Sequence, residues 1–181
     1  NAFGANLNSI TLSGATITNN EGSGGSAAIS LPYLITVGSG TNTLNLVKGG
    51  TIGSTGTLGG TTPFGSVTGS GTLTVNGSSG QTNNIRATFS SFTGTLNLNG
   101  GGTIRGFING GAFVGGTGVA LDIDGATTFA PQTNSGGNSF TFGSLSGSTS
   151  TAVLGGGSAG TASYSIGALN TSTTFAGAIG V

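Results

Sequence analysis

The chain has 181 residues, of which 40 are glycine, and its three basic and three acidic side chains cancel to a formal net charge of zero. Three scattered cations are too few to release the counterions of a nucleic acid, so nucleic-acid binding is not expected. Cysteine and histidine are absent, which excludes disulfides and thiolate metal sites, and no apolar run reaches the roughly 20 residues of a membrane-spanning helix.

Along the chain, short apolar runs that end in glycine recur, and the most regular copy is FSSFTGTLNLNGGG, residues 89–102. Its first half places Phe89 and Phe92 three residues apart, and its second half alternates polar and apolar residues. Successive runs in the phase of Phe89 are separated by 24 to 29 residues, which indicates an internal repeat. These runs begin at positions 10, 35, 64, 89, 113, 142 and 166.

The second half of the repeat aligns without gaps in three copies, residues 71–77, 94–100 and 119–125. Residues 42–46 are expected to be an earlier copy, with Leu44 in the place of Leu73, and residues 149–154 a later one. Alternation with period two is the signature of a β-strand, whose side chains point to opposite faces. The predicted interior residues are Leu73, Val75, Leu96, Leu98, Leu121 and Ile123, and the predicted outer or turn residues are Asn76, Asn99 and Asp124.

A strand of four or five residues cannot bury its apolar face alone, but stacked copies can. The period therefore predicts an all-β fold, a parallel β-solenoid of about seven coils of roughly 25 residues, in a single domain over residues 1–181. Glycine supplies the positive φ that tight corners need, and it occurs too often for helices to form. A disordered linker and a β-sandwich or barrel remain alternatives, although neither requires a phased repeat.

The segments GSGTLTVNG (69–77), FTGTLNLNGGGTIRG (92–106) and YSIGALNTSTTFAGAIGV (164–181) resemble autotransporter-associated β-strand repeat proteins. The resemblance covers most of the chain and is clearest after Gly69. It implies a right-handed β-helix in the passenger region of a large secreted or surface protein of bacteria. It brings no catalytic residues with it. Full members also have a signal peptide and a C-terminal translocator barrel, so the chain is expected to be a processed product or a segment of a larger protein.

Asp122 and Asp124 are the one candidate site for chemistry, because residues two apart on a strand share a face. Paired aspartates could serve as the acid and base of a polysaccharide hydrolase, or contribute to a calcium site. The alternative is that they occupy the places of Asn97 and Asn99 in an outer polar column. Paired threonines such as Thr72 and Thr74 also suggest ice binding, but later copies do not keep them.

The sequence thus favours a non-enzymatic structural segment, secreted or at the bacterial cell surface, with no cofactor. Neither terminus resembles a polar cap, so the open ends of the solenoid predict self-association end to end, or continuation into a longer chain. An adhesin that binds a glycan or another surface ligand is the first alternative. A β-helix enzyme that degrades polysaccharides is the second.

Overall fold

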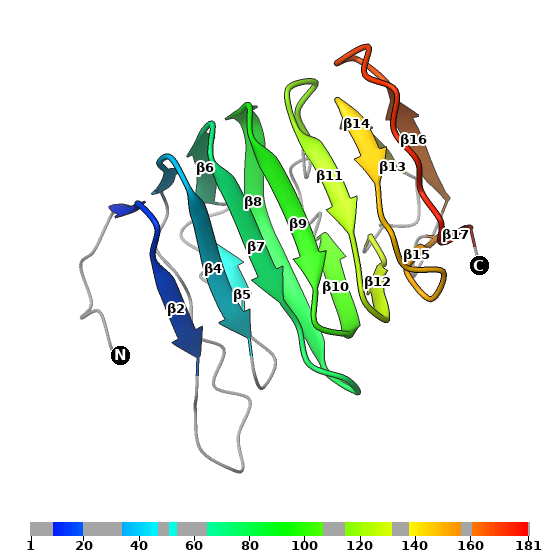
Figure 1. The fold of residues 1–181 in the computed structure, drawn as a ribbon, viewed down its shortest axis with the longest axis horizontal. Helices are drawn as coiled ribbons and strands as arrows, with labels where there is room; N and C mark the ends of the chain where they lie inside the picture. The colour runs from blue at the N-terminus through cyan, green and yellow to red at the C-terminus, as the bar shows by residue number, and fades with distance from the viewer. Residues whose placement is uncertain are drawn as a thin grey trace.

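The structure, a computed structural model, describes residues 9–19, 34–46, 51–53, 65–106, 115–131, 138–156 and 161–180. Every described element is a β-strand and every strand pairing is parallel, so the predicted β-solenoid is confirmed (Figure 1). The strands lie side by side along the long axis of the molecule in chain order. The described residues contain no helix long and apolar enough to cross a membrane.

Each coil contributes to three faces. One face is a six-stranded sheet that lies toward the viewer in Figure 1. Its strands, in stacking order, are β2 (Thr16–Asn19), β4 (Thr41–Leu46), β7 (Thr72–Asn76), β9 (Thr95–Asn99), β11 (Ala120–Ile123) and β14 (Ser144–Ser146).

The other two faces are the two limbs of a nine-stranded sheet, joined by β8 (Thr82–Phe92). Residues 87–92 of β8 pair with the first limb and residues 82–86 with the second, so one long strand runs across a corner of the coil. The first limb contains β1 (Ser9–Leu12), β3 (Leu34–Val37) and β6 (Gly65–Gly69). The second limb contains β5 (Thr51–Gly53), β10 (Gly102–Gly106), β12 (Thr127–Phe129), β15 (Val153–Leu154) and β17 (Ala178–Ile179).

The last coils complete the stack with a separate two-stranded sheet. It pairs β13 (Asn138–Phe142) with β16 (Ala162–Ile166), in a register that sets Phe142 beside Ile166. The repeat starts at positions 142 and 166 are therefore one coil apart, as the sequence predicts. The starts at positions 64 and 113 lie outside the described residues.

The coil count is somewhat lower than the predicted seven. Five successive pairings join the six strands of the six-stranded sheet, so this sheet spans about five turns. Counting repeat starts overestimates the number of turns, because the number of turns between the strands of a column is one less than the number of strands. In addition, the last coil adds only an isolated bridge between Gly147 and Phe175 to this face.

The core consists of apolar columns that run along the solenoid axis. Leu73, Leu96 and Leu121 are in register and fully buried, as are Val75, Leu98 and Ile123 in the next column. Phe89 and Phe92 also point inward, with their rings edge to face at 5.8 Å. Each buried side chain therefore contacts equivalents about 4.8 Å above and below it, which no single coil could provide.

The sequence alignment of residues 42–46 is wrong by two residues. Asn42, and not Leu44, pairs with Leu73, while Leu44 pairs with Val75. The interior accepts Asn42 because its amide is fully hydrogen-bonded. The Nδ2 atom donates to the carbonyl oxygens of Gly38 (3.3 Å), Gly40 (3.2 Å) and Thr72 (3.3 Å), and Oδ1 accepts from the Ala15 N–H (3.3 Å).

The alignment of residues 149–154 is also wrong, because these residues lie on a different face. Val153 and Leu154 pair with Thr128 and Phe129 in the second limb. The residue that follows Leu121 in the column is instead Leu145 of β14, whereas the repeat starts at positions 89 and 142 predict that Leu145 is equivalent to Phe92. The chain turns at Gly143, one residue after β13 ends, so the two matched halves of this copy are distributed over two faces.

A third correction concerns the first limb. The repeat starts at positions 64 and 89 predict that Gly69 lies opposite Gly94, but Gly69 pairs with Phe92 and Thr68 with Ser91. The register shifts between Ser66 and Thr68, an irregularity that one extra residue in a strand produces. Such a shift cannot be predicted from the apolar pattern, because both registers bury the same kind of side chain.

Candidate functional site: an acidic groove

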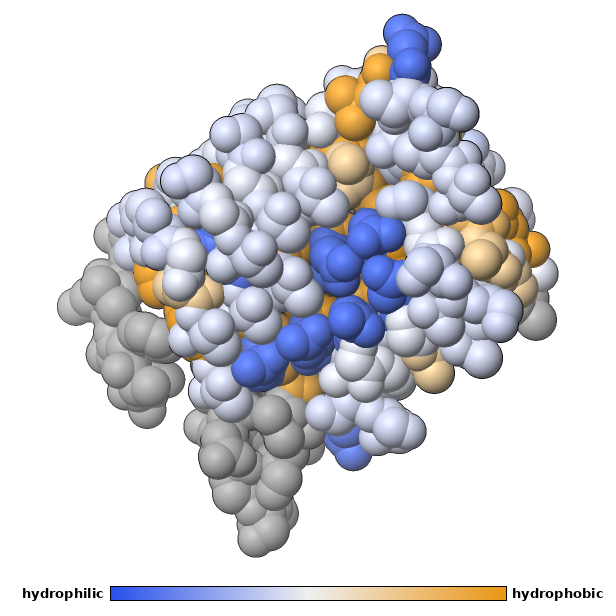
Figure 2. Space-filling model, in the orientation of Figure 1, coloured by the Kyte–Doolittle hydropathy of each residue, from blue (hydrophilic) through white to orange (hydrophobic). Residues whose placement is uncertain are grey.

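The outward side chains of the six-stranded sheet form two polar columns along the axis, and Figure 2 shows strongly hydrophilic residues gathered over this face. The first column is Thr16, Thr43, Thr74, Asn97, Asp122 and Ser146, and the second is Thr18, Asn45, Asn76 and Asn99, followed by Asp124 and Ser148. In the second column Asn45 Nδ2 donates to Thr18 Oγ1 at 3.0 Å, and Asn76 Nδ2 donates to Asn45 Oδ1 at 2.8 Å.

Asp122 and Asp124 take the places in these columns that Asn97 and Asn99 occupy one coil earlier. Asp122 Oδ2 accepts from Asn97 Nδ2, and Asp122 Oδ1 accepts from the Ser146 hydroxyl, both at 2.8 Å. Asp124 Oδ1 accepts from both the N–H and the hydroxyl of Ser148 at 2.9 Å. Among the described residues, both carboxylates are thus held and oriented by neutral donors.

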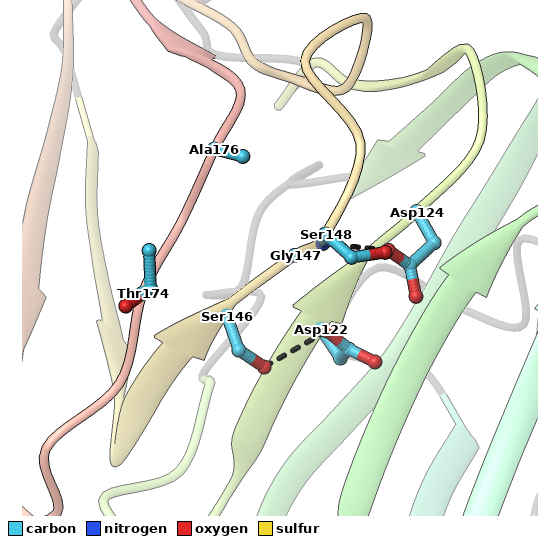
Figure 3. Close-up of a pocket in the computed structure, with 7 residues that line it drawn as sticks. All are labelled: Asp122, Asp124, Ser146, Gly147, Ser148, Thr174 and Ala176. Atoms are coloured by element: carbon cyan, nitrogen blue, oxygen red, sulfur yellow. Dashed lines mark hydrogen bonds between the residues drawn. The ribbon is translucent and has the colours of Figure 1, made fainter.

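A groove opens beside the two carboxylates, with a volume of about 460 Å³. Figure 3 shows Asp122 and Asp124 on one side of it and the final segment of the chain, with Thr174 and Ala176, on the other. That segment is held to Gly147, the residue after β14, whose N–H donates to Thr174 O and whose carbonyl oxygen accepts from the Ala176 N–H. The hollow exists because its lining residues are small: Ser146, Gly147, Ser148, Thr174 and Ala176.

The groove offers two carboxylates and three hydroxyls to a ligand, from Asp122, Asp124, Ser146, Ser148 and Thr174. Calcium takes six to eight oxygen ligands, so carbonyl groups or waters would have to complete such a site. A glycosidase needs two carboxyl groups on opposite sides of the scissile bond. Asp122 instead lies in β11 and Asp124 directly follows the end of that strand, so the two are alternate residues on one face, about 7 Å apart.

The predicted turn residues have differing surroundings. Gly100 and Gly125, which follow Asn99 and Asp124, have positive φ values of 85° and 62°, as a corner requires. Gly77, which follows Asn76, is not a positive-φ corner. A side chain there would approach the carbonyl oxygen of Gly101 at 2.6 Å, so its glycine is required by close packing of the backbone.

Sequence reasoning missed Thr174 at the groove and Asn42 in the core. Thr174 lies 50 or more residues after the aspartates, in the last coil, and no motif links them. Asn42 could have been identified, because it has the same alternation phase as Leu44 and Leu46.

The two described cations, Arg86 and Arg105, lie on adjacent strands of the second limb, and both have the outward alternation phase. Partial burial lowers the pKa of Arg86 from its ordinary value, since removing the guanidinium from water disfavours its charged form.

No family model, no curated protein and no solved structure matches the chain.

Proposed function

We propose that the chain is a non-enzymatic structural element that forms a stiff β-solenoid rod and stacks end to end. The observation that carries this proposal is the C-terminal end of the stack, where large apolar side chains are exposed. Ile179 is 62% exposed, Ile166 is 40% exposed and Leu169 is 39% exposed. Large apolar side chains exposed beside open strand edges are typical of association surfaces.

These residues are exposed because no further coil covers them. Ile166 continues the position of Phe142, and Ile179 continues that of Leu154, both of which are fully buried one coil earlier. The backbone at such an edge also presents N–H and C=O groups that another parallel strand can bind. A further coil would therefore bury apolar surface and extend the hydrogen-bond ladder in the same step.

The opposite end presents the same faces. Among the described strands, β1 is the outermost strand of the first limb, and β2 is the outermost strand of the six-stranded sheet. Ile10 and Ile17 in these strands are only partly buried. A second copy placed head to tail would continue the columns of the first, and such a heterologous contact builds an open filament. The next coil of a longer chain would satisfy the same surface.

We place this rod in a secreted or cell-surface protein of bacteria. The support is the resemblance of residues 69–77, 92–106 and 164–181 to autotransporter-associated repeats, together with a chain free of cysteine. Few charges suit a stacked architecture, because like charges one strand apart repel each other.

The test is the state of the purified chain at high concentration, by electron microscopy and sedimentation. We expect filaments whose length falls sharply in the double variant Ile166→Asp/Ile179→Asp, because charge cannot be buried in the contact. Ser163→Asp/Ser165→Asp is the matched control, since it adds the same number of charges at exposed positions of β16, the strand that carries Ile166. Isolated short particles of the unmodified chain at high concentration would contradict the proposal.

The groove favours a second candidate function, that of an adhesin that binds a glycan. Carboxylates and hydroxyls on a rigid face can hydrogen-bond the hydroxyls of a neutral glycan, which suits an adhesin. A glycan array probed with the unmodified chain and with Asp122→Asn/Asp124→Asn tests it. Binding that is lost in the variant supports the adhesin, and no binding to any glycan counts against it.

A further inference from the structure

Three successive coils of the six-stranded sheet end in the same kind of step, a carboxamide or carboxylate residue followed by glycine. These steps are Asn76–Gly77, Asn99–Gly100 and Asp124–Gly125. An asparagine–glycine step can react with itself, because the backbone nitrogen of the glycine can attack the side-chain carbonyl carbon, Cγ, of the asparagine. Glycine has no Cβ to hinder this approach. The surroundings of the glycine nitrogen therefore decide which step can react.

The three glycine nitrogens have different hydrogen-bond partners. The Gly77 N–H donates to the backbone carbonyl oxygen of Asn99, in the next coil, at 2.8 Å. The Gly125 N–H donates to the hydroxyl of Thr149, also in the next coil, at 3.2 Å. The Gly100 N–H instead donates to the side-chain oxygen of Asn99, the residue directly before it, at 2.7 Å. Of these three nitrogens, Gly100 N is thus the one held against the side chain that it can attack.

The contact at Gly100 brings the two reacting atoms together. A carbon–oxygen double bond is about 1.2 Å long, so Asn99 Cγ lies within about 4 Å of the Gly100 nitrogen. Gly100 is exposed, so water and hydroxide can reach its N–H, whereas Gly77 is buried. The described residues therefore contain one asparagine–glycine step in a reactive arrangement, at Asn99, and one in a protected arrangement, at Asn76.

We propose that Asn99 is a site of spontaneous deamidation. A base removes the proton from Gly100 N, and this nitrogen forms a bond to Asn99 Cγ. The bond from Cγ to the side-chain nitrogen then breaks, and ammonia leaves after taking a proton from solvent, so that a five-membered succinimide ring remains. Water opens the ring at either carbonyl, and position 99 becomes aspartate or isoaspartate. Water is the only other reactant.

Either product places a negative charge beside Asp124. Asn99 is the neighbour of Asp124 in the second polar column, because the Asp124 N–H donates to the carbonyl oxygen of Leu98 at 2.9 Å. Like charges on adjacent strands destabilise a sheet. Isoaspartate also lengthens the backbone by one atom at a crowded corner, where a side chain on Gly100 would collide with the carbonyl oxygen of Gly77. The reaction therefore weakens the contact between two coils, independently of end-to-end stacking.

The positions of the basic residues make the reaction simple to follow. Trypsin can cleave the chain only after Lys48, Arg86 and Arg105. Asn76 therefore falls in the peptide 49–86 and Asn99 in the peptide 87–105. A further asparagine–glycine step, at residues 109–110, lies outside the described residues and falls in the peptide 106–181. Mass spectrometry of each peptide measures the exchange of ammonia for water, and fragmentation identifies the residue.

The full folded chain is incubated at mildly alkaline pH and sampled over time. We expect Asn99 to lose its amide at least about tenfold faster than Asn76, because the Gly77 nitrogen reacts only after local opening of the coil. In denaturant the two rates should become similar, since both residues precede glycine. Asn99→Gln keeps an amide but needs a larger ring, so it should leave the peptide 87–105 unchanged.

A second measurement tests the consequence for stability. Asn99→Asp reproduces the charge of the product, and we expect it to lower Tm by about 1–3 °C, because the new carboxylate faces Asp124. In an Asp124→Asn background the same change should lower Tm less. Circular dichroism shows that each variant is folded and provides Tm.

Several outcomes would overturn the proposal. Equal rates at Asn99 and Asn76 in the folded chain would mean that the hydrogen bond of the Gly100 nitrogen does not matter. A slower reaction of Asn99 in the folded chain than in denaturant would mean that the fold protects this step. Deamidation of the peptide 87–105 that persists in Asn99→Gln would assign the reaction to Asn97. A loss of end-to-end filaments alone would contradict only the proposed function.

Discussion

Asn42 lies beside Leu73 in an interior column in which every later strand of the six-stranded sheet carries leucine: Leu73, Leu96, Leu121 and Leu145. Its side chain is fully buried. The amide connects three successive coils, because it accepts from Ala15, donates to its own corner at Gly38 and Gly40, and donates to Thr72 in the next coil. A polar residue here stabilises the stack because each of these backbone groups would otherwise need another partner.

Replacing this amide with a carboxylate should destabilise the chain strongly. Asn42→Asp removes the Nδ2 donor and places a charge among three carbonyl oxygens, so we expect the free energy of unfolding to fall by about 3 kcal/mol or more. Asn45→Asp makes the same chemical change on the outer surface and should cost less than about 1 kcal/mol. Denaturant unfolding of both variants measures the difference. Equal losses would contradict a special role for Asn42.

The interior leucine column should be far more sensitive than the polar column beside it. Leu96 is fully buried between Leu73 and Leu121, so Leu96→Ala should cost about 2–5 kcal/mol, and Leu96→Asp should prevent stacking. Asn97→Ser replaces the amide donor with a hydroxyl, the group by which Ser146 already donates to Asp122, and should cost less than about 1 kcal/mol. Chemical denaturation followed by far-ultraviolet circular dichroism measures these losses, because the chain lacks tryptophan as a fluorescence probe.

A corner glycine should be intolerant of substitution for reasons of space. A Cβ atom on Gly94 would collide with the carbonyl oxygen of Gly71 in the neighbouring coil, and backbone cannot move aside as a flexible side chain can. We expect Gly94→Ala to cost about 3 kcal/mol or more in unfolding free energy. Gly80 is the control: it has a φ of 74° and open space around it, and asparagine tolerates that conformation. Gly80→Asn should therefore change stability only slightly, and a large loss there would weaken the argument from crowding.

Tyr164 should make stability depend on alkaline pH. Its hydroxyl donates to Gly155 O at 2.6 Å, and burial raises the pKa of this phenol above its ordinary value near 10. The unfolded chain therefore loses the proton first, so the stabilising contribution is complete below about pH 10 and declines as the pH rises above it. Tyr164→Phe should cost about 1 kcal/mol at neutral pH and reduce this decline. Thermal unfolding between pH 7 and 11 tests it, and an unchanged alkaline profile in the variant would count against it.

The repeat from residue 71 to residue 125 shows how far the sequence alone can predict this fold. Alternation in residues 72–76, 95–99 and 120–123 specified strands, and equal spacing of their leucines specified a shared column, which the pairings reproduce. A glycine after Asn99 and after Asp124 marked two corners correctly. These predictions succeed because strand period and positive φ are local properties of the chain.

The errors arose where two arrangements have the same local pattern. Residues 42–46 alternate equally well with Leu44 or with Asn42 in the leucine column, and only the hydrogen bonds to Ala15 and Thr72 favour Asn42. Residues 149–154 contain a strand as expected, but its face depends on the turn at Gly143 and on pairing with β12. Register is decided by contacts between coils, which a single sequence does not reveal.

The sequence by itself determined that this protein stacks short parallel strands around apolar columns, because period-two alternation and a phased repeat have few other solutions. Only the tertiary structure decided which residues meet across coils. The groove beside Asp122 and Asp124 requires Thr174 and Ala176 from the last coil, and the pairing of Arg105 with Asn84 depends on the register of β8 and β10. The physical reason is that side chains one coil apart lie about 4.8 Å from each other in space while the chain between them is over twenty residues long.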